Sequence, residues 1–171
     1  MKRILSGLIL LVIVGMYSSC SITLNGASIP PEMKTINVEY FENNALFVQT
    51  TLSQTLTEAL KERIRSQTRL SIVNNPEADA SFSGSITNYT IAPVSVQSTN
   101  PNSPPIANAS RLTITVKVKY TDNISKKGFD QDFTKTADFT GDIASQEQNL
   151  ILTINKQLTE DIFNKAFADW N

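Results

Sequence analysis

Apolar residues recur along the chain with two periods, and these predict two kinds of element. Leucine and isoleucine recur every four positions over 52–64, which predicts a helix of roughly four turns. The same spacing over 145–170 predicts a second, longer helix near the C-terminal end. A capping-box pair stands at the start of each predicted helix: Thr51 with Gln54, and Ser145 with Gln148.

Strict alternation of apolar and polar residues predicts the strands. The apolar positions Ile36, Val38 and Tyr40 predict a half-buried first strand, and 70–73 predicts a short second one. A third strand begins at Ala80, and its inward-facing positions are Ala80, Phe82, Gly84, Ile86, then Tyr89 and Ile91. The change of parity predicts a β-bulge near Thr87-Asn88. Pro93 predicts that the end of this strand is an edge or a break.

Two segments, 111–120 and 129–138, alternate so regularly that they predict an antiparallel hairpin in a definite register. If paired residue numbers sum to 249, every polar cross-strand pair is favourable and each contributes about 0.2–1 kcal/mol. The predicted pairs are Lys119 with Asp130, Lys117 with Asp132, Arg111 with Asp138, Thr115 with Thr134, Thr113 with Thr136, Val116 with Phe133, and Leu112 with Ala137. Residues 97–108, before the hairpin, predict a polar, proline-rich loop of a length typical of disordered or functional segments.

The predicted element order is β-α-β-β-β-β-α. It indicates an α+β fold in which two helices pack on one face of a mostly antiparallel four- to five-stranded sheet. The other face is then polar, rich in threonine and paired charges, and suits either a wet interface with another protein or plain solvent.

Composition narrows the classes of function. The 171 residues are 40% apolar and 18% charged, enough for one packed domain, and they include no histidine and one cysteine. Structural zinc and the common serine, cysteine and metal mechanisms therefore lack their residues, and we expect no cofactor and no enzymatic activity. No phosphate-binding or metalloprotease motif occurs.

The first twenty residues predict export and lipidation. Lys2 and Arg3 precede an apolar run of about 11 residues, too short to cross a bilayer of roughly 30 Å. The lone cysteine, Cys20, follows small residues and resembles the lipidation site of bacterial lipoproteins; the alternative is an ordinary signal peptide with a chance cysteine. We predict a signal peptide (1–19), an acylated tether (20–33) and a single domain (34–171). Without Lys2 and Arg3 the mature chain carries 13 basic and 16 acidic residues, a net charge of −3, so no nucleic-acid partner is expected.

Five basic residues are candidates for contact with lipid phosphates. Three of them share the polar face of the predicted hairpin and two lie at its turn: Arg111, Lys117, Lys119, Lys126 and Lys127. The alternative is that the face is neutralised by the paired aspartates and that the turn lysines are merely solvated, and the predicted register favours this alternative for the face.

Several segments resemble the LptE family of lipopolysaccharide (LPS)-assembly lipoproteins as it occurs in Bacteroidetes. The segments are 26–36, 40–45, 51–61, 111–114 and 160–166, and the likeness as a whole extends over nearly all of the mature chain. The resemblance implies two helices on a four-stranded sheet and an outer-membrane lipoprotein that faces the periplasm, anchored by its N-terminal lipid. It also implies that the protein plugs the LPS translocon β-barrel, LptD, helps that barrel to assemble, and supports LPS transport to the outer leaflet.

Three interpretations are therefore open. The first is the barrel plug, and the second is a periplasmic lipid-binding or transfer lipoprotein with its own cavity. The third, a hydrolase, has little support in a chain without histidine. No LPS-contacting residue of the family is carried over, because none aligns securely with this sequence.

Overall fold

The computed structural model describes residues 29–47, 49–96 and 106–168. The predicted signal peptide, Cys20, most of the predicted 97–108 loop and Trp170 lie outside the described residues. Eight elements follow in chain order: β1 (Thr35–Val38), β2 (Glu42–Asn43), α2 (Leu52–Gln67), β3 (Ser71–Ile72), β4 (Ala80–Val96), β5 (Ile106–Asp122), β6 (Lys127–Thr140) and α3 (Glu147–Phe167).

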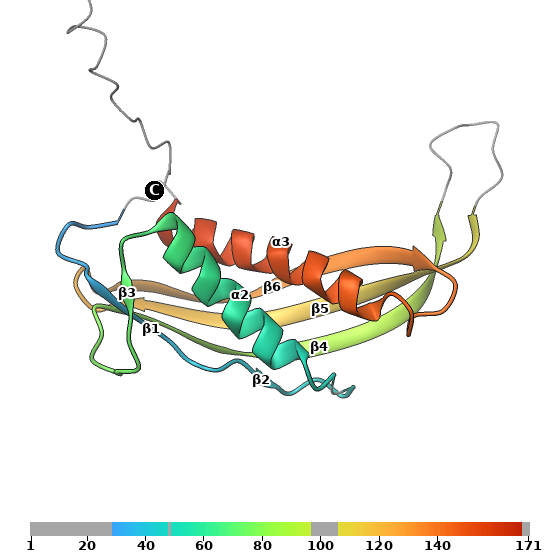
Figure 1. The fold of residues 1–171 in the computed structure, drawn as a ribbon, viewed down its shortest axis with the longest axis horizontal. Coiled ribbons are helices and arrows are strands. Elements are labelled where there is room, and N and C mark those ends of the chain that lie inside the picture. Colours follow the sequence, from blue (N-terminus) through green and yellow to red (C-terminus); the bar gives the residue numbers. More distant parts are fainter. Residues whose placement is uncertain (1–28, 48, 97–105, 169–171) are drawn as a thin grey trace, which may run out of the picture.

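The strands form one sheet in the order β3-β1-β4-β5-β6, and β2 pairs with β4 beside it. Both helices cover the same face of this sheet, as the sequence predicts (Figure 1). The α+β class is confirmed, with one two-residue strand more than the predicted order contains. The sheet is also more mixed than expected, because β1 runs parallel to both β3 and β4. Parallel neighbours require a crossover connection, and α2 supplies the one between β1 and β3.

The hairpin of β5 and β6 has the predicted register throughout. Lys117 lies opposite Asp132, Arg111 opposite Asp138 and Val116 opposite Phe133, and no irregularity interrupts the ladder. Both strands extend beyond the predicted segments, so Ile106 to Asn108 belong to β5 rather than to a loop. The alternation therefore specified the pairing better than it specified the strand ends.

The predicted bulge in β4 is confirmed, since the pairing with β5 shifts between Ile86 and Asn88. Pro93 does not break the strand, which continues to Val96. In the described chain, β4 beyond Ile86 pairs only with β5, so Pro93 lies on an edge where its missing N–H costs no ladder bond.

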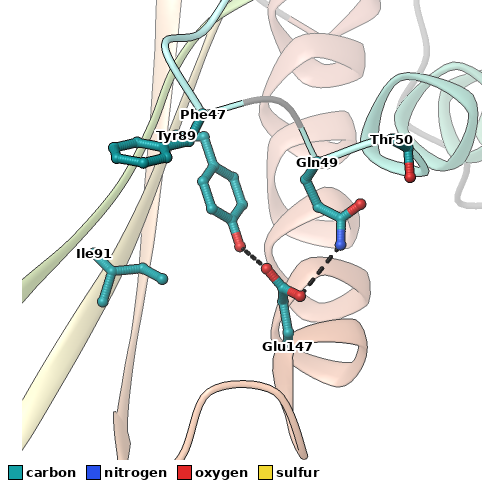
Figure 2. Close-up of a pocket in the computed structure, with 6 residues that line it drawn as sticks. All are labelled: Phe47, Gln49, Thr50, Tyr89, Ile91 and Glu147. Carbon is teal, nitrogen blue, oxygen red and sulfur yellow. Dashed lines mark hydrogen bonds between the residues drawn. The ribbon is translucent and has the colours of Figure 1, made fainter.

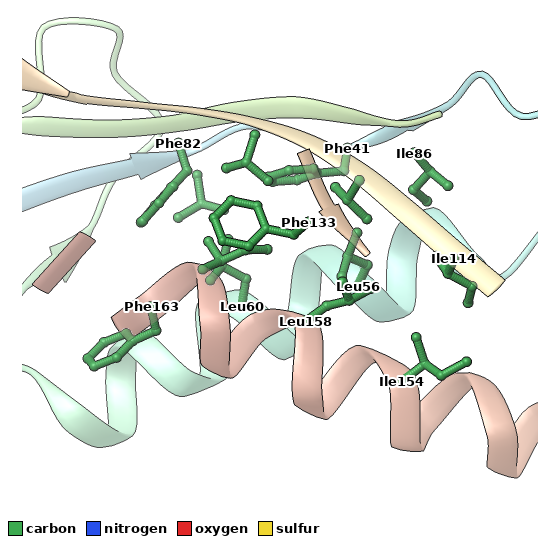
Figure 3. Packing of buried hydrophobic residues seen from close by; sticks show 14 of the residues in the cluster. Phe41, Leu56, Leu60, Phe82, Ile86, Ile114, Phe133, Ile154, Leu158 and Phe163 are labelled. Atoms are coloured by element: carbon green, nitrogen blue, oxygen red, sulfur yellow. The ribbon is translucent and has the colours of Figure 1, made fainter. Parts of the chain in front are cut away.

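The core lies between the sheet and the two helices (Figure 3). Five consecutive inward positions of β5 are buried, and so are the facing positions of α2 and α3: Leu112, Ile114, Val116, Val118 and Tyr120 from the strand, Leu52, Leu56, Leu60 and Ile64 from α2, and Ile151, Ile154, Leu158, Ile162 and Phe163 from α3. Burial of each large side chain contributes about 1.5–3 kcal/mol relative to exposure. The two predicted helical faces are thus confirmed as core.

The first strand ends earlier than its alternation predicts, and the inward position assigned to Tyr40 is wrong. β1 stops at Val38, Tyr40 is 57% exposed, and its neighbour Phe41 is completely buried instead. The Phe41 N–H donates to the Thr57 Oγ1 of α2 at 3.1 Å. Gly84 on β4 makes room for this ring, because a Cβ atom there would lie 2.9 Å from Phe41 Cε1.

Neither predicted capping box forms. Thr51 makes no side-chain cap bond; its hydroxyl instead donates to Gln49 Oε1 at 3.3 Å, and its N–H donates to the same atom at 3.1 Å. The Ser145 hydroxyl donates to the carbonyl of Asp142 at 3.0 Å, and α3 begins after Gln146. Both helix starts are therefore shaped by the preceding loops rather than by the reciprocal bonds of a capping box.

Truncating Leu158 to alanine should lower the free energy of unfolding by about 2–5 kcal/mol, because the side chain is completely buried and would leave a cavity. Urea unfolding followed by circular dichroism measures this. Leu152 is the matched control on the same helix, since it is 51% exposed and its truncation should cost less than about 1 kcal/mol. Equal losses for the two variants would contradict the assignment of the helical faces.

Candidate functional site

The first candidate surface is the face of the sheet that points away from the helices. On β5 and β6 it consists of alternating threonines and charged residues, and serines continue it onto β4: Ser81, Ser83 and Ser85, then Arg111, Thr113, Thr115, Lys117 and Lys119, then Asp130, Asp132, Thr134, Thr136 and Asp138. All of these side chains are exposed or half-buried, and no helix of the described chain covers them (Figure 1). We call this surface the outer face.

The charges of the outer face are largely paired across strands. Arg111 donates from Nε and Nη2 to the two carboxylate oxygens of Asp138 at 2.5 and 2.8 Å, a bidentate geometry. These bonds lower the pKa of Asp138 and raise that of Arg111. Lys117 Nζ lies 3.6 Å from Asp130, its diagonal neighbour, rather than next to Asp132. The Thr115 and Thr134 hydroxyls bond to each other at 2.9 Å.

The structure does not gather the five basic candidates into one site. Arg111 and Lys119 lie at opposite ends of the outer face, eight positions apart along β5, or roughly 27 Å at a rise of about 3.4 Å per residue. Lys119 forms no ion pair with any described residue, and Lys126 and Lys127 are exposed at the hairpin turn. Lys126 has a positive φ of 57°, the left-handed conformation of a tight turn.

The second candidate is a pocket at the end of the molecule where both helices begin (Figure 2). It has a volume of about 560 Å³, within the usual range of ligand sites. Three segments build it: the loop before α2, the middle of β4 and the first turn of α3. The lining residues are Phe47, Gln49, Thr50, Tyr89, Ile91 and Glu147.

Glu147 links the three walls of this pocket. The Tyr89 hydroxyl donates to Oε1 at 2.5 Å, and the Gln49 amide donates to Oε2 at 3.2 Å (Figure 2). Burial, the hydrogen bond to Glu147 and its negative charge together raise the pKa of Tyr89, so the phenol stays protonated and keeps its role as donor. The carboxylate also stands in the first turn of α3, where the helix dipole favours a negative charge.

Apolar side chains beside the pocket are exposed to solvent. Leu46 is completely exposed, Phe47 is 72% exposed and Ile91 is 43% exposed. Ile91 keeps the inward parity predicted for it, since it lies opposite the buried Leu112, but its side chain lines the open pocket and remains partly exposed. Sequence reasoning missed the pocket, although an apolar Leu46-Phe47 pair shortly after Asn43-Asn44 was a signal available in the sequence.

Two further cavities lie on the described surface. One, of about 550 Å³, lies near the start of the domain and is lined by Ile29, Pro30, Pro31, Met33, Lys34 and residues 66–70. The other, of about 310 Å³, follows the seam between α2 and α3, where Asn155 donates to Thr55 Oγ1 and leaves its own Oδ1 unpartnered. No group of three or more metal-ligating side chains occurs in the described part of the chain, and none of its helices is long and apolar enough to cross a membrane.

Comparison with known proteins adds a family and a fold. A family model described as LptE, lipopolysaccharide-assembly, matches residues 33–166. No curated protein matches the sequence significantly.

Several solved structures are similar. A neuraminyllactose-binding hemagglutinin homologue from Helicobacter pylori has a TM-score of 0.52 at 9% identity, over 81% of this chain and 86% of that one. The hypothetical protein CT253 from Chlamydia trachomatis has a TM-score of 0.50 at 10% identity, over 78% of this chain and 95% of that one. A minor lipoprotein from Acinetobacter baumannii has a TM-score of 0.49 at 14% identity, over 78% of this chain and 92% of that one. At these identities the first two show a shared fold.

Replacing Tyr89 with phenylalanine should lower the free energy of unfolding by about 1–2 kcal/mol. A hydrogen bond to a charged acceptor contributes about 1.5–3 kcal/mol when well buried, and this pocket is open to water. Urea unfolding measures the change, and Tyr40→Phe is the control because Tyr40 is exposed. A Tyr89→Phe variant as stable as the parent chain would show that the bond to Glu147 does not hold β4 against α3.

Proposed function

This chain belongs to the LptE family of lipopolysaccharide-assembly proteins, and from that premise we propose that it plugs the LPS translocon β-barrel, LptD, and helps it to assemble. In this role it supports LPS transport to the outer leaflet without catalysing a reaction. The family match runs from Met33 to Ala166 and includes every described strand and helix except the last residue of α3, so the proposal concerns the domain and not a fragment of it.

The outer face is the observation that carries this proposal. The lumen of a transmembrane barrel is polar and wet, so a plug needs a surface that bonds to polar groups without burying unpaired charge. Threonine hydroxyls and cross-strand ion pairs such as Arg111 with Asp138 meet that need. The face is broad and uncovered, while the opposite face is sealed by α2 and α3.

The length of the domain fits the same role. β5 has 17 residues, which at about 3.3 Å per residue gives roughly 56 Å. A bilayer with its headgroups is about 40–45 Å thick. A single strand of this protein is therefore long enough to follow the wall of a membrane-spanning barrel from one side to the other.

Lipid anchoring at Cys20 completes the proposal. The described chain starts at residue 29 near the end of the domain where α3 finishes, and the pocket lies at the opposite end (Figure 1). An outer-membrane anchor facing the periplasm would hold the first end near the lipid and direct the pocket away from it. The Bacteroidetes origin suggested by the sequence belongs to the same proposal.

The second interpretation, a lipid carrier with its own cavity, finds less support. Among the described residues the space between helices and sheet is filled by side chains that are almost completely buried, and the pockets open at the surface. An acyl chain inside the domain would have to displace residues such as Leu56, Ile114 or Leu158.

Affinity purification of the full chain from membranes should recover a large outer-membrane β-barrel. Thr115→Lys replaces a small hydroxyl side chain with a long charged one in the middle of the outer face and should reduce recovery at least fivefold, while leaving the core intact. Gln157→Lys adds the same charge at an exposed position of α3 and is the matched control. The proposal fails if the parent chain recovers no barrel, or if Thr115→Lys recovers it as well as the control.

Lipidation has a separate test. Cells fed radiolabelled palmitate should label the parent chain, and Cys20→Ala should lose both the label and retention in the membrane fraction. Position 20 lies outside the described residues, and on the proposed boundaries the domain starts at residue 34, so we expect thermal unfolding of the variant to be unchanged. A mature parent chain whose mass contains no acyl group would favour the ordinary signal peptide instead.

A further inference from the structure

We infer that the pocket lined by Phe47, Tyr89 and Glu147 binds a cationic side chain, arginine or lysine, of the barrel partner. This ligand class follows from three features of the described pocket: the acceptor capacity left on the carboxylate, the aromatic wall beside it, and the absence of a second charge in its lining.

The first feature is a count of hydrogen-bond sites. An ionised carboxylate offers about four lone-pair positions on its two oxygens. In Glu147 one position on each oxygen is occupied, by the Tyr89 hydroxyl and the Gln49 amide, and both donors are neutral. One position on each oxygen is left, which is the arrangement that a guanidinium fork fills with two parallel N–H bonds.

The second feature is the wall of the pocket. Phe47 and Tyr89 both present aromatic rings to it, and Ile91 contributes an aliphatic side (Figure 2). A guanidinium or ammonium group close to aromatic rings gains about 0.5–2 kcal/mol from their negative faces. The hydrocarbon stem of arginine or lysine would cover the exposed ring of Phe47, which in the isolated chain contacts water.

The third feature is the charge of the lining. Glu147 carries the only carboxylate among the six residues, the Tyr89 phenol stays protonated, and no basic side chain stands with them. Its negative charge has no cationic partner among the described residues and would repel a phosphate or a carboxylate. The pocket therefore selects cations and disfavours anionic headgroups.

Structural bonding alone does not account for these features. Glu147 clearly ties α3 to β4 and to the loop before α2, but that role requires neither a cavity nor exposed apolar side chains. Leu46 and Phe47 gain nothing from the fold in their exposed positions. Contact with a partner that inserts a cation would bury Phe47 and neutralise Glu147 together.

The identity of the partner rests on the proposed function, whereas the chemistry of the pocket does not. The first experiment therefore uses small probes on the full chain in detergent. N-acetyl-arginine methylamide carries the guanidinium, and the citrulline analogue has nearly the same shape without the charge. Binding is followed through the δ1-methyl NMR signal of Ile91, with the methyl of Ile124, at the far hairpin, as an internal reference.

We expect the arginine probe to shift the Ile91 signal with a dissociation constant in the millimolar range and the citrulline probe to bind at least tenfold more weakly. Glu147→Gln retains the shape of the side chain and removes its charge, so it should raise the dissociation constant of the arginine probe at least tenfold. Glu160→Gln, on the exposed side of α3, should bind like the parent chain. Equal binding of the two probes, equal shifts of Ile91 and Ile124, or an unchanged Glu147→Gln variant would overturn the inference.

The second experiment separates this inference from the proposed function. Glu147→Lys places a cation where a cation should bind and should reduce recovery of the barrel at least fivefold, provided that thermal unfolding shows a folded variant. If the parent chain recovers the barrel and a folded Glu147→Lys variant recovers it equally, the pocket assignment is wrong and the plug function stands. If the arginine probe binds but the parent chain recovers no barrel, the pocket chemistry stands and the partner is wrong.

Discussion

The structure depends on the two-sided character of β5. This strand lies between β4 and β6, and each second side chain enters the core while the others remain in water. A shift of one residue would move the whole set of Leu112, Ile114, Val116 and Val118 to the wrong face. The helices therefore have one place to pack, and the opposite face is left to threonines and paired charges. The division into a dry side and a wet side, from which the proposed function follows, is fixed along this strand.

The sequence predicted well wherever this alternation is long. The register of β5 and β6 followed from matching charges, because a shift of two residues would place either Lys117 opposite Thr134 or Lys119 opposite Gly128 and so lose an opposed lysine–aspartate pair. The bulge in β4 was predictable from the same alternation, since a strand whose inward parity changes midway must carry an extra residue relative to its neighbour.

Prediction was weaker where local pattern competes with tertiary contact. Tyr40 and Phe41 are both aromatic, and only the packing under α2 and the space left by Gly84 decide which is buried. Ile91 keeps the inward parity but lines the open pocket and remains partly exposed. The sequence could not bring the pocket residues together because Glu147 lies 58 positions after Tyr89 and 98 after Gln49, and no short motif links them.

β6 lies at a free edge of the sheet, where another strand could pair with it. β6 is 14 residues long and has no neighbour on its outer side in the described chain, no bulge and no proline, so it offers an open ladder to any strand that approaches. If two molecules met edge to edge in antiparallel fashion, centred on Thr134, Asp130 of one would oppose Asp138 of the other. Like charges in direct opposition destabilise such a pairing. The aspartates therefore work against self-association in this register.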